Sequence, residues 1–286
     1  MQLAIAAGDY RLVAAPARGG SILSFTWRGE PLMREAEGPD ILDVGCFVMV
    51  PFANRIKDGR FTWRGQPRAI PPNFAGRDPQ NPIHGYGWQA EWDVAEAAPA
   101  RLRFGHVHAG DGWPWPYRAD LTYALDTGGL SARLTLTNTG DEPMPAGLGF
   151  HPYFPRSETT RYRGLHHGEW QTERDPLPVA LDRRATAVDW WEGRPIGTRV
   201  VDTVYAGREG PLDILWPERA MALTIAPSPA LDLTAVYAPA GTDWFCAEPM
   251  NHLTDAVNGR DPEAPMPALA PGEMAAVEMR LSVRPL

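Results

Sequence analysis

The sequence is poor in cysteine, in net positive charge and in long apolar runs, and each shortage argues against a class of protein. The two cysteines, Cys46 and Cys246, lie in apolar surroundings without a zinc-type Cys spacing, so we expect two reduced core thiols. A net charge of -8 with scattered arginines disfavours nucleic acids and anionic membranes as partners. No run reaches the length of a membrane span, and residues 1–10 make a poor signal peptide, so we expect a cytoplasmic protein.

Several motifs for other chemistries are also missing. The chain has no Gly-x-Gly-x-x-Gly or Gly-x-x-x-x-Gly-Lys loop for phosphates, and no Gly-x-Ser-x-Gly segment for a serine hydrolase. The neighbouring His166 and His167 would point to opposite faces of a strand, and no third ligand follows at a regular spacing. The sequence therefore predicts no metal site and no cofactor.

The chain is rich in proline, glycine and tryptophan, with 30, 28 and 11 residues respectively. These residues are spread along the chain, which indicates frequent turns between short segments. Apolar and polar residues alternate over 130–136 and again over 277–283, as they do in half-buried strands, and 21–27 and 121–125 look similar. No amphipathic helix of twelve or more residues is apparent, although a short one could follow Gly38 with Asp40 as its cap. These patterns predict an all-β protein.

The predicted architecture is one domain over residues 1–286, built from two large antiparallel sheets packed face to face. No Ser/Gly-rich linker divides the chain, and the charged, proline-rich segment 156–197 is interpreted as an excursion over the surface. The pentapeptide Phe-Thr-Trp-Arg-Gly at 25–29 and 61–65 is interpreted as a strand that enters a glycine turn. A broad sheet can bring side chains from distant strands together on one concave face.

Four separate segments carry side chains suited to acid–base chemistry on such a face. His84 lies in a glycine-flanked loop, His151 lies between aromatic residues, and Glu248 follows an apolar strand-like run and precedes a proline. A histidine and a carboxylate can be brought to proton affinities near the working pH, and they can therefore act as an acid and a base. Arg55, in Asn54-Arg55-Ile56, adds a cation. Taken singly, each residue also has a structural interpretation: a surface glutamate, a satisfied core histidine, a turn histidine or a surface ion pair.

Taken together and in this order, the four segments resemble those of the aldose 1-epimerase, or mutarotase, family, over about residues 20–281. The resemblance implies a galactose mutarotase-like β-sandwich and an isomerase that opens and closes the ring of a monosaccharide without a cofactor. It implies that Glu248 is the base, His151 the acid and His84 a second active-site histidine. The remaining residues that the resemblance assigns to sugar binding are Arg55, Asn54 and Asp202, while Asp255 and Asn258 follow the glutamate. Trp113 lies in a loop that borders the cleft in the family, where it could stack on the sugar or equally pack under the loop.

Two departures from the galactose-type pattern affect the sugar rather than the chemistry. Ala146-Gly147-Leu148 precedes Gly149-Phe150-His151 where the galactose type has an Asn and a Thr, and Ala235 stands where it has a glutamine two residues before Tyr237. The resemblance therefore points to the broader bacterial branch of the family. The acid–base set is intact, and the identity of the sugar is left open.

Three functions follow as alternatives. The first is a 1-epimerase for a free hexose or pentose. The second is a 1-epimerase for a phosphorylated or sulfonated sugar, which needs extra cations at the cleft, such as Arg77, Arg60 or Arg18. The third is a carbohydrate-binding protein without catalysis, which has no need for an acid and a base together. In each case the partner is a small monosaccharide, and the sequence leaves open a monomer or a homodimer.

Overall fold

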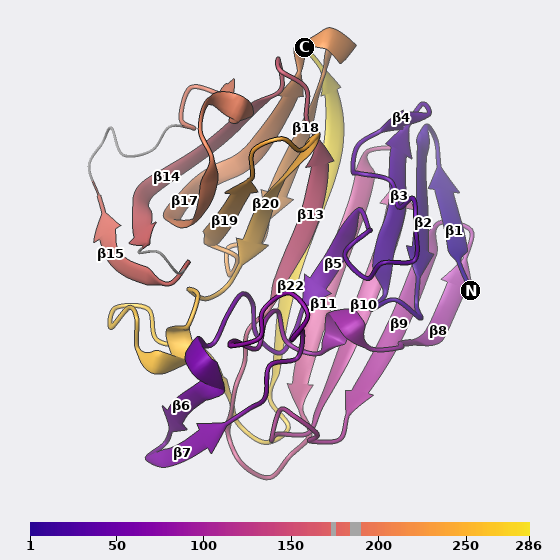
Figure 1. Ribbon diagram of the computed structural model, residues 1–286. Helices are drawn as coiled ribbons and strands as arrows, with labels where there is room; N and C mark the ends of the chain where they lie inside the picture. Colours follow the sequence, from indigo (N-terminus) through magenta and orange to yellow (C-terminus); the bar gives the residue numbers. More distant parts are fainter. Residues whose placement is uncertain (173–175, 184–189) are drawn as a thin grey trace.

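The computed structural model describes residues 1–172, 176–183 and 190–286, and its regular structure is almost entirely β-strand (Figure 1). Frequent glycine and proline turns separate the strands, as the composition predicts. The strands are β1 (Leu3–Ala7), β2 (Tyr10–Ala15), β3 (Ser21–Trp27), β4 (Glu30–Pro31), β5 (Cys46–Met49), β6 (Arg60–Trp63), β7 (Gln66–Ala69), β8 (Asp93–Ala98), β9 (Arg101–His108), β10 (Tyr117–Asp126), β11 (Gly129–Asn138), β12 (Met144–Pro145), β13 (Gly149–Pro155), β14 (Arg161–Thr172), β15 (Pro178–Asp182), β16 (Arg194–Pro195), β17 (Val201–Trp216), β18 (Met221–Pro227), β19 (Leu233–Ala238), β20 (Trp244–Met250), β21 (Ala268–Leu269) and β22 (Met274–Pro285).

Helical structure in the described residues is confined to short 3-10 turns. These turns are η1 (Lys57–Gly59), η2 (Gly87–Gln89), η3 (Ile196–Thr198), η4 (Pro217–Arg219) and η5 (Ala256–Asn258). Within the same residues, none of the helices has the length and apolar character that crossing a membrane would require.

The long strand β17 takes part in both layers of the sandwich. Its residues 201–205 pair with β19, and its residues 212–216 pair with β18. From β19 one layer continues through β20, β13, β5, β3, β2 and β1, and from β18 the other continues through β22, β11, β10, β9 and β8 (Figure 1). All of these pairings are antiparallel. The predicted all-β sandwich of antiparallel sheets is therefore confirmed.

The central strands of the first layer are buried on both faces. Along β5, β13 and β20 nearly every residue is buried, whereas β10 and β11 alternate between buried positions and positions that are partly or fully exposed. One face of this layer packs into the core, where Phe154 contacts Phe245. The other face is covered by the chain between β5 and β8, which carries η1, β6, β7 and η2: Trp88 stacks on Phe47 of β5, and the His84 ring meets His151 of β13 edge-on. Polar side chains under this cover are enclosed rather than solvated.

The strands predicted from alternation are present. Residues 130–136 lie in β11, 277–283 in β22, 21–27 in β3 and 121–125 in β10. Both copies of Phe-Thr-Trp-Arg-Gly are strands that enter two-residue hairpin turns, and in each turn the Arg and the Gly have positive φ. This backbone is that of a type I′ turn, which matches the twist of the flanking strands.

Two local predictions are wrong. The segment 156–197 does not only run over the surface, because β14 lies within it and pairs along most of its length with β17. Residues 173–175 and 184–189 of that segment lie outside the described residues. No helix follows Gly38 either. Asp40 instead accepts a hydrogen bond from the Leu42 N–H at 2.9 Å, which closes a local turn.

Candidate active site

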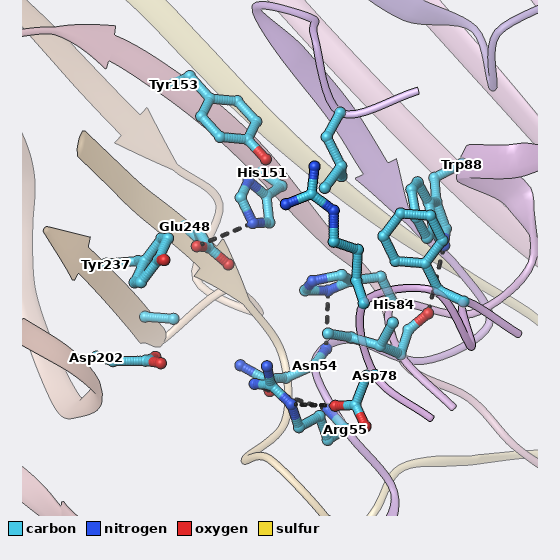
Figure 2. A pocket seen from close by; sticks show the side chains of 15 residues that line it. Asn54, Arg55, Asp78, His84, Trp88, His151, Tyr153, Asp202, Tyr237 and Glu248 are labelled. Carbon is cyan, nitrogen blue, oxygen red and sulfur yellow. Dashed lines mark hydrogen bonds and ion pairs between the residues drawn. The ribbon is translucent and has the colours of Figure 1, made fainter. Parts of the chain in front are cut away.

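A pocket of about 240 Å³ opens where the covering chain meets the first layer (Figure 2). Strands β13, β17, β19 and β20 supply one wall, and segment 50–92 supplies most of the other. The strand wall is lined by His151, Tyr153, Asp202, Ala235, Tyr237 and Glu248. The opposite wall is lined by Asn54, Arg55, Phe74, Arg77, Asp78, Ile83, His84 and Trp88, together with Leu42 from the segment before β5.

Glu248 and His151 face each other across neighbouring strands. In the β13–β20 pair Gly149 lies opposite Met250 and Tyr153 opposite Cys246, which places His151 beside Glu248 on the pocket face. The distance from His151 Nε2 to Glu248 Oε1 is 3.2 Å, and the two side chains are only 8% and 4% exposed. Sheet register thus aligns two groups that lie almost a hundred residues apart.

Burial shifts the proton affinities of this pair in opposite directions. It raises the pKa of Glu248 well above 4.5, an effect to which the nearby Asp202 carboxylate adds. It lowers the pKa of His151 to about 3, and the charge of Arg34 acts in the same direction. At pH values between the lowered pKa of His151 and the raised pKa of Glu248, the pair holds one proton. The carboxyl group retains this proton as the pH rises, and the imidazole takes a second one only in acid.

His84 is held as a neutral hydrogen-bond donor. Its backbone φ of 58° is left-handed, and Gly85 follows with a φ of 70°, so the chain turns sharply beneath the ring. The Asn54 N–H points at Nδ1 at a distance of 3.2 Å, which assigns Nδ1 as the acceptor and leaves the ring proton on Nε2. Burial lowers the pKa of His84 well below 6.5.

Arg55 is fixed before any ligand arrives. Its Nε donates to Asp78 Oδ2 at 2.8 Å, and Nη1 lies 3.4 Å from Asn54 Oδ1. Burial works against ionisation of Asp78, but hydrogen bonds from Arg55 and from the Asn81 backbone outweigh it and lower the pKa of this carboxyl. Asp255 accepts the Lys57 N–H at 2.9 Å, and its own N–H donates to Arg55 O at 2.9 Å, so this residue anchors the same segment.

Asp202 extends the polar wall from β17. The residue is exposed along one side, yet the surrounding cleft limits hydration of its carboxyl group and raises its pKa. Tyr237 lies directly opposite it on β19, and Ala235 lies opposite Glu248. Ala235, which stands where the galactose type has a glutamine, therefore lines the pocket next to the acid–base pair.

The structure brings together six of the seven predicted site residues and places Trp113 elsewhere. Trp113 is fully buried and contacts Phe52 and Phe61, with ring centroids 5.3 Å and 6.0 Å away. Of the two roles expected for this tryptophan, stacking on the sugar and packing under the loop, its burial corresponds to packing. The aromatic walls that sequence reasoning missed are Phe74, Trp88 and Tyr153, although the last two stand inside the His84 and His151 motifs.

Cys246 lies closer to the site than its sequence context indicates. Its Sγ and the ligand atoms of His151 and Glu248 all lie within 4.8 Å of one another, which makes this the single candidate metal group among the described residues. Burial raises the pKa of the thiol well above its ordinary value, so it is neutral.

Comparison with known proteins gives a consistent result. The chain matches the aldose 1-epimerase family over residues 1–282. It is 31% identical over 276 residues to the uncharacterised protein YphB of Escherichia coli K12, and the aligned region covers 93% of each chain. A candidate aldose 1-epimerase from E. coli K12 superposes with a TM-score of 0.91 at 29% identity over 100% of this chain and 99% of that one. A galactose mutarotase-like protein from Clostridium acetobutylicum superposes with a TM-score of 0.88 at 18% identity, covering 100% of this chain and 95% of that one. The chain belongs to the aldose 1-epimerase family.

Proposed function

We propose that this protein interconverts the α and β anomers of a free aldose, a hexose or a pentose, and that Glu248 and His151 transfer the protons. The observation that carries the proposal is the buried pair itself, with 3.2 Å between His151 Nε2 and Glu248 Oε1 at the wall of a pocket. Ring opening needs one group that removes a proton from O1 and one that gives a proton to O5. The pair is suited to this because it holds one proton in all.

In the resting pair the proton lies on Glu248, and its transfer across the 3.2 Å contact to His151 Nε2 gives the proposed reactive form, with a protonated His151 and a carboxylate at Glu248. The carboxylate takes the O1 proton, C1=O1 forms as C1–O5 breaks, and His151 Nε2 gives its proton to O5. Rotation about C1–C2 turns the aldehyde, and the reverse transfers close the ring as the other anomer. The pair begins and ends with one proton, so no net acid or base is consumed.

The remaining polar side chains are assigned to holding the sugar. The Nε2–H of His84 donates to the ring region, the guanidinium of Arg55 donates to hydroxyl oxygens, and Asp202 accepts from hydroxyl groups. Asn54 fixes both His84 and Arg55 through its backbone N–H and its side-chain oxygen. Phe74 and Trp88 supply flat apolar surface for the C–H face of the ring.

The first experiment is anomer exchange measured by proton NMR or polarimetry on glucose, galactose, xylose, arabinose and fucose. Acceleration of at least one of them supports the proposal and ranks the sugars. A carbohydrate-binding protein without catalysis would instead give saturable binding in a titration and the spontaneous exchange rate for every sugar.

A second candidate, a 1-epimerase for an anionic sugar, is favoured by Arg77. This residue lines the pocket, and within the described residues it forms no ion pair, whereas Arg55 is held by Asp78. Of the other two arginines named from the sequence, neither lines the pocket, and Arg18 donates to the carbonyls of segment 38–43. A free guanidinium at a pocket wall suits a phosphate or sulfonate group.

The test compares glucose with glucose 6-phosphate as substrates of the wild type, of Arg77→Gln and of Arg60→Gln as the matched control. If the anionic sugar is the substrate, it is turned over faster than glucose, and Arg77→Gln alone removes that preference. If all three proteins turn over glucose 6-phosphate no faster than glucose, this candidate is rejected and the first one is unaffected.

A further inference from the structure

Arg34 lies behind the pocket and is tied to the strand that carries His151. It follows β4, and its backbone N–H donates to Tyr153 O at 2.8 Å. Its guanidinium carbon lies 3.9 Å from the centroid of the Tyr153 ring and 5.2 Å from that of Trp244. A guanidinium over an aromatic face is a favourable cation–π arrangement, and more so where water is partly excluded.

The same guanidinium holds the pocket wall that comes from segment 35–45. Arg34 Nε and Nη2 donate to Val44 O at 3.2 Å and 2.9 Å, and Nη2 also donates to Leu42 O. The side chain of Leu42 lines the pocket. Within the described residues Arg34 makes no ion pair, because these donors go to backbone carbonyls. Its positive charge therefore faces carbonyl oxygens and aromatic rings rather than a carboxylate.

Tyr153 carries the effect of Arg34 to the acid–base pair. Its ring lies 4.8 Å from that of His151 at an interplanar angle of 33°, and the His151 ring stacks on Phe47 from 4.3 Å away. Tyr153 therefore borders the imidazole on one side while Arg34 lies over its ring. The titratable or charged groups near His151 are Arg34, Cys46, His84, Tyr153, Cys246 and Glu248.

We propose that Arg34 is a positioning residue for proton transfer: it clamps Tyr153 against His151, fixes Leu42 at the pocket wall and places an unneutralised positive charge behind the pair. The inference rests on the proposed function, because it assigns Arg34 a role in that reaction. Its charge works with burial to keep the second proton off His151. A planar guanidinium can stack and donate to two carbonyls at once, whereas a lysine ammonium keeps the charge without the plane.

The test uses Arg34→Met, Arg34→Lys and the matched control Arg219→Met. Arg219 has the same kind of contacts away from the pocket, with its guanidinium 5.4 Å from the Trp216 ring and Nη1 donating to Pro31 O at 2.9 Å. For a sugar that the wild type turns over, kcat and KM are measured from about pH 2.5 to pH 9, so that the range includes the acid limb expected from the lowered pKa of His151. Melting temperatures show which variants are folded.

The expected result separates charge from geometry. Arg34→Met lowers kcat about tenfold and moves the acid limb of the profile to higher pH, because removing a cation raises the pKa of the neighbouring imidazole. Arg34→Lys lowers kcat similarly but leaves the acid limb in place. Arg219→Met changes neither. A residue with only a structural role would lower the rate without moving the limb.

Three results would overturn the inference. The first is an Arg34→Met protein with the wild-type kcat and acid limb, the second is a lower kcat in Arg34→Met with the acid limb unmoved, and the third is an equal loss in Arg219→Met. If the wild type accelerates no sugar, the proposed function fails first, and the proton NMR titration of the His151 ring decides on Arg34 separately. The ring must then titrate at higher pH in Arg34→Met than in the wild type, and an unchanged titration rejects the role.

Discussion

Within residues 1–172, 176–183 and 190–286, two histidine–glutamate pairs lie on strands of the same sheet, and one of the two lies in a pocket. His167 Nε2 is 2.5 Å from Glu209 Oε1, closer than the 3.2 Å between His151 and Glu248. The side chains of His167 and Glu209 are 54% and 57% exposed, whereas those of the other pair are 8% and 4% exposed. By distance alone, the exposed pair would be the stronger candidate for proton transfer. What distinguishes the two pairs is therefore their surroundings.

Water accounts for that difference. Around His167 and Glu209 solvent screens the charges, and such an exposed pair contributes only about 0–1 kcal/mol to stability. Around His151 and Glu248 burial moves both pKa values, so the pair holds one proton over a wide pH range. We infer that the covering chain between β5 and β8, which removes the water, does as much for the proposed chemistry as the two residues themselves.

The largest expected contrast is between His151→Asn and His167→Asn. The first should lower kcat/KM at least ~100-fold, since it removes the proposed acid, and general acid–base groups contribute on that scale. The second should leave kcat/KM unchanged, because its ring lies in solvent on the same sheet. Polarimetry on the best sugar measures both. Comparable losses in the two variants would remove the distinction between the pairs.

The pH profile of the wild type sharpens the comparison further. Burial lowers the pKa of His151 to about 3, so kcat/KM should stay near its plateau at pH 5, well below the ordinary histidine value. On the alkaline side activity should fall only above the raised pKa of Glu248. Rates measured from pH 4 to pH 10 test this, and an acid limb at an ordinary histidine pKa would show that the pair is solvated.

A smaller effect is expected from Asp202→Asn. This change replaces a charged hydroxyl acceptor by a neutral amide and leaves the His151–Glu248 contact in place, so KM should rise about tenfold, the scale of one charged hydrogen bond, while kcat at neutral pH changes less. Removal of the Asp202 charge also lowers the pKa of Glu248, so the alkaline limb should move to lower pH. Glu209→Gln is the control, because it removes a carboxylate from the same strand outside the pocket. A fall in kcat with an unchanged KM would assign Asp202 to the chemistry instead.

The smallest expected effect is on stability. The folded state holds a proton on Glu248 that the unfolded chain releases near pH 4.5, so the wild type loses stability as the pH rises from there toward the raised pKa. Glu248→Gln removes this cost and should raise the melting temperature at pH 7.5 by about 2 °C per kcal/mol gained, with little change at pH 4. Calorimetry measures this effect, and a variant that is less stable at pH 7.5 would contradict it.

The sequence predicts those parts of the fold and site that local patterns encode. Alternation predicts β11 and β22, and the short motifs around His84, His151 and Glu248 identify side chains that sheet register then brings together. The strand β14 is not predicted because three of its inward positions, Gly164, His166 and Gly168, carry no apolar side chain, so the alternation is hidden.

The rest of the site depends on packing that sequence cannot express. A tryptophan in a glycine- and proline-rich loop can stack on a ligand or fill a core, and Phe52 and Phe61 decide the matter for Trp113. Arg34 carries no motif at all. Its position follows only from the pairing of its backbone with β13 and from the carbonyls of Leu42 and Val44.

The most direct test of the account is anomer exchange by proton NMR for the wild type, Glu248→Gln and Glu209→Gln side by side on the sugar panel. The account predicts acceleration in the wild type and in Glu209→Gln, and a loss of at least ~100-fold in Glu248→Gln, with sugar binding retained. Equal acceleration in all three proteins would show that the buried pair is not where the protons move.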